Sequence, residues 1–280
     1  MVSRIEMFHF NVKADPIFLF GRRRSKLTPD QSLLADTAGF RSTRWSVVLL
    51  SAQSKAPGSR AALGFLCRLY WYPLYAFVRR RGYNPEDAQD LTQGFFLHLL
   101  DHKALAQVDP VKGKFRSFLL ASIQNYLSKE LDRARCLKRG GNAEFVPVDA
   151  RDAEERYRLE FTDDLTAEKI FDARCALTLL DQAMRLLSAE YATEGKTAIL
   201  EMLKPFVNPI DSEVLPSYEE LAKRLELSVD GVRTLVHRLR KRYTALVREE
   251  VARTVSDPGQ IDEELHALCD ALIASEGRLV

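Results

Sequence analysis

The stretch SYEELAKRLELSVDGVRTLVHRLRKRY, Ser217–Tyr243, predicts two short helices with a tight break between them. Ser217 and Glu220 form an S-x-x-E capping box, so the first helix should begin directly after Ser217. Ser228 is expected to cap the second helix. Glu226 stands where such a turn usually has glycine, so we expect a slightly open turn. The pattern is that of a helix-turn-helix, whose second helix enters the major groove of DNA.

The second of these helices carries an excess of positive charge. Between Ser228 and Arg242 there are five basic residues against the single acid Asp230. A basic helix end also complements the helix dipole, so a merely solvated face is the alternative interpretation. The capped partner helix favours contact with DNA. The side chains on or near the face opposite the apolar stripe are Arg233, Thr234, His237, Arg238, Lys241 and Arg242.

The composition is that of a globular chain, with 46% hydrophobic and 29% charged residues among 280, a length sufficient for two domains. The net charge is only +2, so a surface for nucleic acid requires local segregation of charge. That segregation is present: residues 114–139 hold seven basic residues against two acids, and residues 140–165 hold eight acids against three arginines.

The sequence also indicates a compartment. The four cysteines lie far apart without a C-x-x-C motif, which favours reduced thiols and no zinc site. No apolar run approaches the ~20 residues of a membrane span, and the N-terminus lacks a signal-peptide pattern. We therefore expect a cytoplasmic protein without a membrane span.

Helical periodicity with almost no strand signal predicts an all-α fold. We expect two helical domains joined by an acidic linker, the second containing the helix-turn-helix. The predicted parts are a flexible leader (1–41), a first helical domain (42–139), the linker (140–165), the helix-turn-helix domain (166–253) and an acidic amphipathic tail (254–280).

The first domain contains two informative helices and one interrupted by proline. Asn84 caps a helix that runs to Leu100, and its outward face is polar and mildly acidic. The segment 115–139 predicts a long basic helix with amides and aromatics, a combination suited to single-stranded or melted DNA. Pro73 is expected to kink or split the preceding helix, residues 60–81.

Motifs of enzyme chemistry are missing from the sequence. It contains no phosphate-binding glycine loop, no H-E-x-x-H and no G-x-S-x-G. His98 and His102 have a spacing that can bind metal, but no third ligand is near in sequence, so a structural role is the stronger interpretation. We expect neither an enzyme nor a cofactor.

Two segments in order resemble RNA polymerase sigma factors, especially the extracytoplasmic-function (ECF) group. YPLYAFVRRRGYNPEDAQDLTQGFFLHLL with FRSFLLASIQNYLSKELDRARCLKR is similar to their region two. LLDQAMRLLSAEY with the opening stretch is similar to their region four. The resemblance implies a protein that binds core RNA polymerase and promoter DNA, and it leaves room for an anti-sigma or other regulatory partner.

The resemblance also implies roles for particular residues. Asp87, Asp90, Leu91 and Gln93 would bind polymerase, although Gly94 replaces the acid that the family usually has there. The basic helix would open and read the downstream promoter element. The residues expected to act there are Arg116, Gln124, Asn125, Lys129, Arg133 and Arg135, with Gln124 replacing the family's arginine. The second helix of the helix-turn-helix would read the upstream element.

Two other functions remain open from the sequence. A stand-alone helix-turn-helix regulator would use the N-terminal domain for interaction, and an adaptor would bind proteins through the region-two-like face without initiating transcription. The tail also has two interpretations. Its apolar stripe extends the second domain's core, or its acids fold back over the basic recognition helix as a lid.

Overall fold

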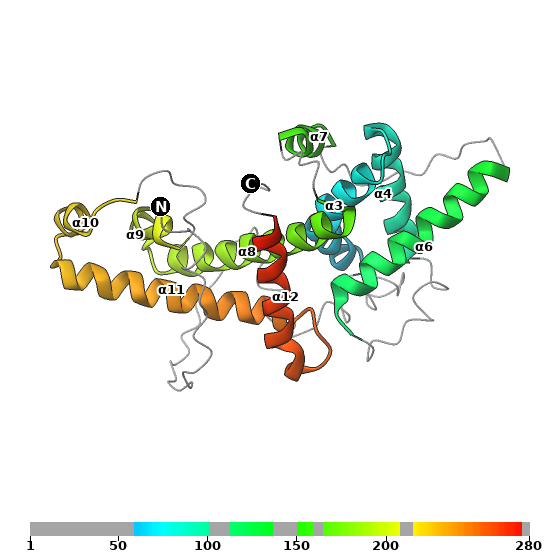
Figure 1. Cartoon of the computed structure of the whole chain (residues 1–280). Helices are drawn as coiled ribbons and strands as arrows, with labels where there is room; N and C mark the ends of the chain where they lie inside the picture. Colours follow the sequence, from blue (N-terminus) through cyan, green and yellow to red (C-terminus); the bar gives the residue numbers. More distant parts are fainter. Residues whose placement is uncertain (1–58, 101–112, 137–149, 160–164, 208–214, 276–280) are drawn as a thin grey trace. The chain divides into compact units, whose positions relative to one another are not determined.

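A computed structural model describes residues 59–100, 113–136, 150–159, 165–207 and 215–275, all within the compact unit Thr43–Val280. These residues form helices, without a strand among them (Figure 1). The prediction of an all-α fold is confirmed. The predicted leader, residues 1–41, lies outside the described residues.

The first hydrophobic core is built on helices α3 (Ser59–Arg80), α4 (Pro85–Leu100) and α6 (Phe115–Cys136). Pro73 lies inside α3, which continues through it, so the predicted split is wrong. The side chains of Leu74 and Phe77, in the helical turn that follows Pro73, are completely buried. Burying each such side chain contributes about 1.5–3 kcal/mol, enough to offset the hydrogen bond that proline removes.

The acidic segment expected to be a flexible linker contains helix α7 (Ala150–Leu159). Glu154 of α7 accepts hydrogen bonds from Arg79 Nε at 2.8 Å and from Tyr75 Oη at 2.6 Å. Tyr157 is buried and lies 4.8 Å beneath the Arg79 guanidinium. This part of the predicted linker is therefore a helix, and Glu154 and Tyr157 have partners on α3.

Helix α8 (Ala167–Thr193) takes part in two hydrophobic cores (Figure 1). Its first half, Ala167–Cys175, completes the core of α3, α4 and α6, with Phe171 against Phe77 at 6.2 Å between ring centroids. Its second half, from Ala176 to Leu187, belongs to the second core. A single unbroken helix thus connects the two cores.

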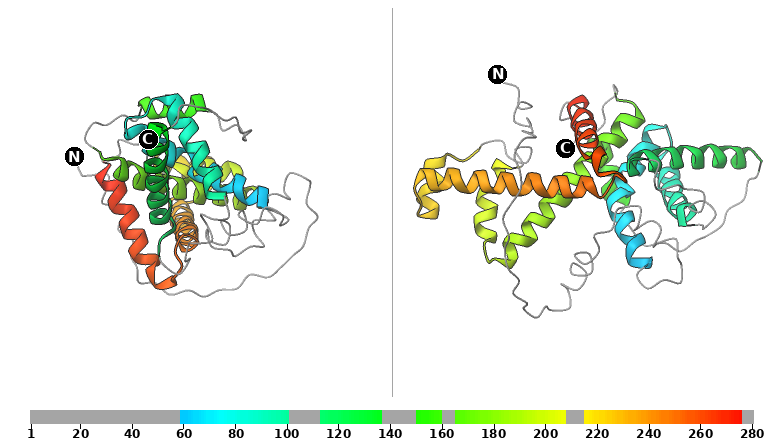
Figure 2. Two further views of the ribbon diagram at one scale, coloured as in Figure 1. Left: turned by 90° about the vertical axis from the view of Figure 1, so that its right-hand side faces the viewer. Right: turned by 90° about the horizontal axis from the view of Figure 1, so that it is seen from below.

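The second core contains α9 (Thr197–Leu203), η3 (Lys204–Phe206), α10 (Tyr218–Leu225), α11 (Val229–Ala252) and α12 (Ile261–Ala274), with η5 (Pro258–Gln260) leading into α12. Helix α12 packs on α8 and α11, and Leu265 and Leu268 are buried there. The tail's apolar stripe therefore extends this core, as one of its two interpretations predicted. Figure 2 shows α12 (red) beside the first turn of α6 (green).

Candidate nucleic-acid interface

Helix α4 presents a polar face that its N-terminal cap organises. Asn84 Oδ1 accepts the backbone N–H of Asp87 at 2.8 Å, and Asn84 Nδ2 donates to the Asp87 carboxylate at 2.8 Å. Asp87 and Asp90 are exposed, Gln93 is half-buried, and Leu91 is half-buried against the first core. The three polar side chains, spaced three residues apart, form one continuous hydrogen-bonding face. We call Asp87, Asp90 and Gln93 the α4 face.

Gly94, next to the α4 face, is in close contact with α6. A Cβ atom at this position would lie 2.3 Å from Tyr126 Oη and 3.4 Å from Tyr126 Cζ. The Tyr126 ring is held in turn by Phe95, at 5.9 Å between centroids, and by His98, at 5.4 Å. The acid that the family usually has here would therefore displace Tyr126. The sequence offered no local signal for this contact, because the two residues lie on different helices.

The six predicted downstream-element residues fall into four groups by the surroundings of their side chains. Asn125 and Lys129 are exposed on its outer face. Gln124 is half-buried and donates to Glu168 of α8 at 3.2 Å. Arg133 and Arg135 lie in the last turns of α6, and their side chains are outside the description. The exposed amide of Asn125 is thus the clearest candidate on this helix for contact with an unstacked base.

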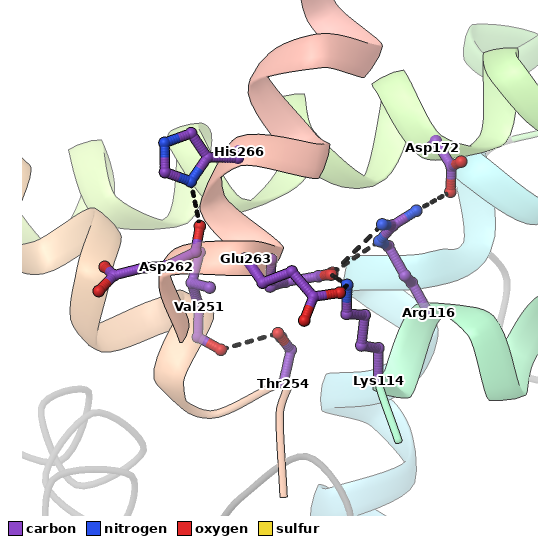
Figure 3. A network of polar contacts seen from close by, with 9 residues as sticks. Lys114, Arg116, Asp172, Val251, Thr254, Asp262, Glu263 and His266 are labelled. Atoms are coloured by element: carbon purple, nitrogen blue, oxygen red, sulfur yellow. Dashed lines mark hydrogen bonds and ion pairs between the residues drawn. The ribbon is translucent and has the colours of Figure 1, made fainter. Parts of the chain in front are cut away.

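The sixth residue, Arg116, is enclosed by acids (Figure 3). Its Nε donates to Glu264 Oε1 of α12 at 2.6 Å, and Nη1 donates to Asp172 of α8. Burial opposes the charge on Arg116, but both carboxylates favour it, and the net effect raises the pKa of the guanidinium. Only 14% of its side chain is exposed, so DNA contact by Arg116 requires a change of partners.

The acids of α12 do not bind the predicted DNA-reading residues of α11. Glu263 and Glu264 bind Lys114 just before α6, at 2.8 and 3.3 Å, and Asp262 pairs with Arg248 near the end of α11. The lid over the recognition helix is wrong. Its acids were visible in the sequence, but the partners of Glu263 and Glu264, almost 150 residues away, were not.

The connection between α10 and α11 is closed. Ser217 makes both hydrogen bonds of the predicted capping box, and Ser228 accepts the backbone N–H of Gly231 at 3.1 Å. Glu226 adopts the left-handed conformation, with φ 55°, and the Leu227 N–H donates to the Ala222 carbonyl at 3.0 Å. The expected open turn is wrong, because Glu226 takes the conformation that glycine usually supplies.

Helix α11 exposes part of its predicted basic surface. Arg233, Thr234, His237, Arg238 and Lys241 are all exposed, and Val232, Val236 and Leu239 are buried on the other side. Two of the exposed side chains bond within the helix. Arg233 pairs with Asp230 at 3.0 Å, and Thr234 Oγ1 donates to the Asp230 carbonyl at 2.9 Å. His237, Arg238 and Lys241 form the part of this surface that we call the α11 basic face.

Arg242, the last of the predicted upstream-element residues, binds acids of its own chain. Its Nε donates to Glu190 of α8 at 2.8 Å, and Nη1 donates to Glu249 at 3.2 Å. The hydrogen bonds to Glu190 are the main reason why the pKa of Arg242 is raised. Its neighbour Arg240 donates to the Phe206 carbonyl at 2.9 Å, a structural contact that the sequence did not suggest.

Comparison with known families adds a decisive observation. Residues 68–136, from within α3 to the end of α6, match the family model of sigma-70 region 2. The chain carries a sigma-70 region 2. This match supports a sigma-70-family sigma factor, a class of transcription initiation factors that act with RNA polymerase at promoters and are not enzymes. The resemblance of the first segment to region two of this family is thereby confirmed. No curated protein and no solved structure matches the chain.

The match does not extend to α10 and α11, so their interpretation as a helix-turn-helix stays a prediction. Within the described residues no helix combines the length and apolar character needed to cross a membrane. No cluster of three potential metal ligands occurs in that part of the chain either. His98 stacks on Tyr126, and His102 lies outside the described residues.

Proposed function

We propose that the chain is a sigma factor of the ECF type, which binds core RNA polymerase and directs promoter recognition and opening. The observation that carries this proposal is the region 2 match, because that region includes both the α4 face and the exposed part of α6. In this proposal the α4 face binds core polymerase. Its acids are exposed and have no close cation on their own helix, so they are available to basic residues of a partner.

The α11 basic face is proposed to read the upstream promoter element in the major groove. A helix of this diameter fits that groove, and an arginine there can make two hydrogen bonds to a guanine edge. Arg238 is the arginine of this face, which makes it our candidate for base recognition. Lys241, one turn further along, suits a phosphate contact, because phosphates are bound by point charges without regard to sequence.

Promoter opening is proposed to use the outer face of α6. A base taken out of the stack needs an amide or similar group for its edge and an aromatic or apolar surface for its face. Asn125 supplies the amide, and Lys129, four residues later, lies on the same exposed side of the helix. Arg116 and Gln124 are bonded to acids, so we assign them a secondary role that follows a change of partners.

The remaining predictions belong to the same proposal. The predicted segments 42–139 and 166–253 would carry the two promoter-reading surfaces, with 140–165 between them, although residues 167–175 of the second segment pack in the first core. The chain would act in the cytoplasm, without a cofactor, and an anti-sigma protein is a candidate regulatory partner.

Reconstituted transcription tests the proposal. The purified chain is added to core RNA polymerase with a pool of randomised promoter fragments, and run-off transcripts are sequenced. We expect transcripts that depend on the chain and share two separated sequence elements. Asp90→Ala with Gln93→Ala should lower the affinity for core polymerase, whereas Glu201→Ala, an exposed acid on α9, should not.

Three outcomes are distinguishable. Polymerase binding with selective transcripts supports the sigma factor. DNA binding without polymerase binding supports the stand-alone regulator. Polymerase binding without transcripts supports the adaptor. Either of the last two results refutes the proposed function.

A further inference from the structure

A group of charges outside the α4 and α11 faces joins the start of α6 to the first turn of α12. Lys114 and Arg116, at the start of α6, contact the carboxylates of Glu263 and Glu264 in the first turn of α12 (Figure 3). Glu264 is 1% exposed and bonds both cations, whereas Glu263 is 72% exposed and bonds Lys114 alone. Asp172 of α8 adds a further acid beside Arg116.

A backbone hydrogen bond holds the same junction together. The N–H of Phe115 donates to the carbonyl of Thr254 at 2.8 Å. Thr254 is the second residue after α11, and its hydroxyl donates to the Val251 carbonyl at 2.8 Å (Figure 3). Phe115 is the first residue of α6, so its N–H has no acceptor within that helix. This amide therefore reports whether the start of α6 remains against the C-terminal part of the chain.

The chemistry of this junction resembles that of a phosphate contact. Lysine and arginine bind phosphate oxygens by charge-assisted hydrogen bonds, and carboxylates can occupy the same donors. Stability alone explains such a cluster poorly, because removing ions from water costs several kcal/mol per ion and a buried pair is often no better than apolar packing. Both cations also lie within the region 2 match, Arg116 in the helix that we propose to contact melted DNA and Lys114 just before it.

We propose that α12 is an internal latch whose acids compete with nucleic acid for Lys114 and Arg116. In the free chain the latch lowers the affinity of α6 for single-stranded DNA, and phosphates must displace the carboxylates before these cations contribute. Helix α12 itself stays in place, because Leu265 and Leu268 anchor it in the second core. This inference rests on the proposed function in one respect, namely that α6 is a nucleic-acid surface.

The test compares two variants of equal charge on the same helix. Glu263→Gln removes an acid that binds Lys114, whereas Asp270→Asn removes an exposed acid with no ion pair to α6. Both substitutions are made in the full chain. Fluorescence anisotropy at low salt then measures the binding of a labelled oligo(dT) of about 20 nucleotides, which is longer than a typical binding site on single-stranded DNA. We expect Glu263→Gln to bind roughly twofold to fivefold tighter than the parent, and Asp270→Asn to match the parent within about 1.5-fold.

The double variant Glu263→Gln, Glu264→Gln extends the measurement. It removes both acids that bind Lys114 and leaves Asp172 on Arg116, so one cation becomes available. The slope of log affinity against log salt should become steeper by about 0.7, the contribution of one phosphate contact on a single strand. Amide exchange at Phe115 should also become faster in this variant. If the double variant is unfolded, Glu263→Gln carries the test alone, since its side chain is largely exposed.

The latch is refuted by equal affinities of the parent and Glu263→Gln, by an equal gain for Asp270→Asn, or by absence of oligo(dT) binding in all variants at low salt. None of these measurements uses RNA polymerase. A failed transcription assay therefore leaves the latch testable, and a failed latch leaves the sigma-factor proposal intact.

Discussion

Replacing Gly94 by alanine should destabilise the protein, whereas the same replacement of an ordinary glycine inside a helix stabilises it. Gly94 lies inside α4, where alanine normally stabilises a helix by about 0.5–1 kcal/mol. Here the added Cβ would lie 2.3 Å from Tyr126 Oη, well inside van der Waals contact. The Tyr126 ring has little room to move away, because Phe95 and His98 lie against it.

The magnitude follows from two opposing contributions. Forcing an extra carbon into a packed site costs about 1–3 kcal/mol. Subtracting the gain in helix propensity leaves a net destabilisation of Gly94→Ala between about 0 and 2.5 kcal/mol. In a Tyr126→Phe background the hydroxyl is gone, and the nearest ring atom, Cζ, is 3.4 Å from the new Cβ, an ordinary contact. There the same substitution should stabilise by about 0.5–1 kcal/mol.

The measurement is a double-mutant cycle on urea unfolding of the full chain, with Gly94→Ala, Tyr126→Phe and their combination. Gly64→Ala is the matched control. Gly64 also lies inside a helix, and a Cβ there would meet only the end of the Arg68 side chain, at 3.5 Å. We expect this control to stabilise the chain and the cycle to give a coupling free energy of about 1–3 kcal/mol.

Two results would contradict this prediction for Gly94→Ala. If Gly94→Ala stabilises the chain as much as Gly64→Ala does, or if the cycle shows no coupling, the close packing of Tyr126 on Gly94 is not a constraint on this helix pair. The absence of an acid at position 94 would then need another explanation.

Three further predictions follow from single contacts. Glu226→Gly should raise the free energy of unfolding by about 0.5–1 kcal/mol, because glycine adopts a φ of 55° without strain, and a lower urea midpoint would contradict the assigned turn. Arg238→Ala should weaken DNA binding by about 1–3 kcal/mol at unchanged stability. Arg242→Ala should mainly lower the melting temperature, since Glu190 loses its partner. If paired assays show that Arg242→Ala weakens DNA binding and Arg238→Ala lowers the melting temperature, this assignment is refuted. Burial would raise the pKa of Glu154, but hydrogen bonds from Arg79 and Tyr75 outweigh burial and lower that pKa. The ionised Glu154 therefore stabilises the fold above about pH 4.5, and this contribution is lost as the pH falls through the lowered pKa. Glu154→Gln should remove this part of the pH dependence of stability, and an unchanged profile would exclude the contact.

The short-range features of this protein were predictable from the sequence. The helices of the first domain, the capping box at Ser217 and the cap at Ser228 are formed by groups within a few residues of one another. Such contacts leave a fixed spacing in the sequence, and apolar residues at helical period identify the buried side of each helix. For the same reason the exposed positions of Asp90, Asn125 and Arg238 were accessible without coordinates.

The sequence by itself therefore determined where helices such as α4, α6, α10 and α11 begin and which side of each is apolar, although it did not predict α7. Only the tertiary structure decided the partners of the charged side chains, including Arg116 with Glu264 and Arg242 with Glu190. It also decided that α8 serves two cores, and that Glu226 closes its turn. The physical reason is that a charged residue has the same helical spacing whether it faces water or an acid on another helix. Its local pattern therefore carries no information about a partner 50 or 150 residues away, and only the packing of the helices brings the two together.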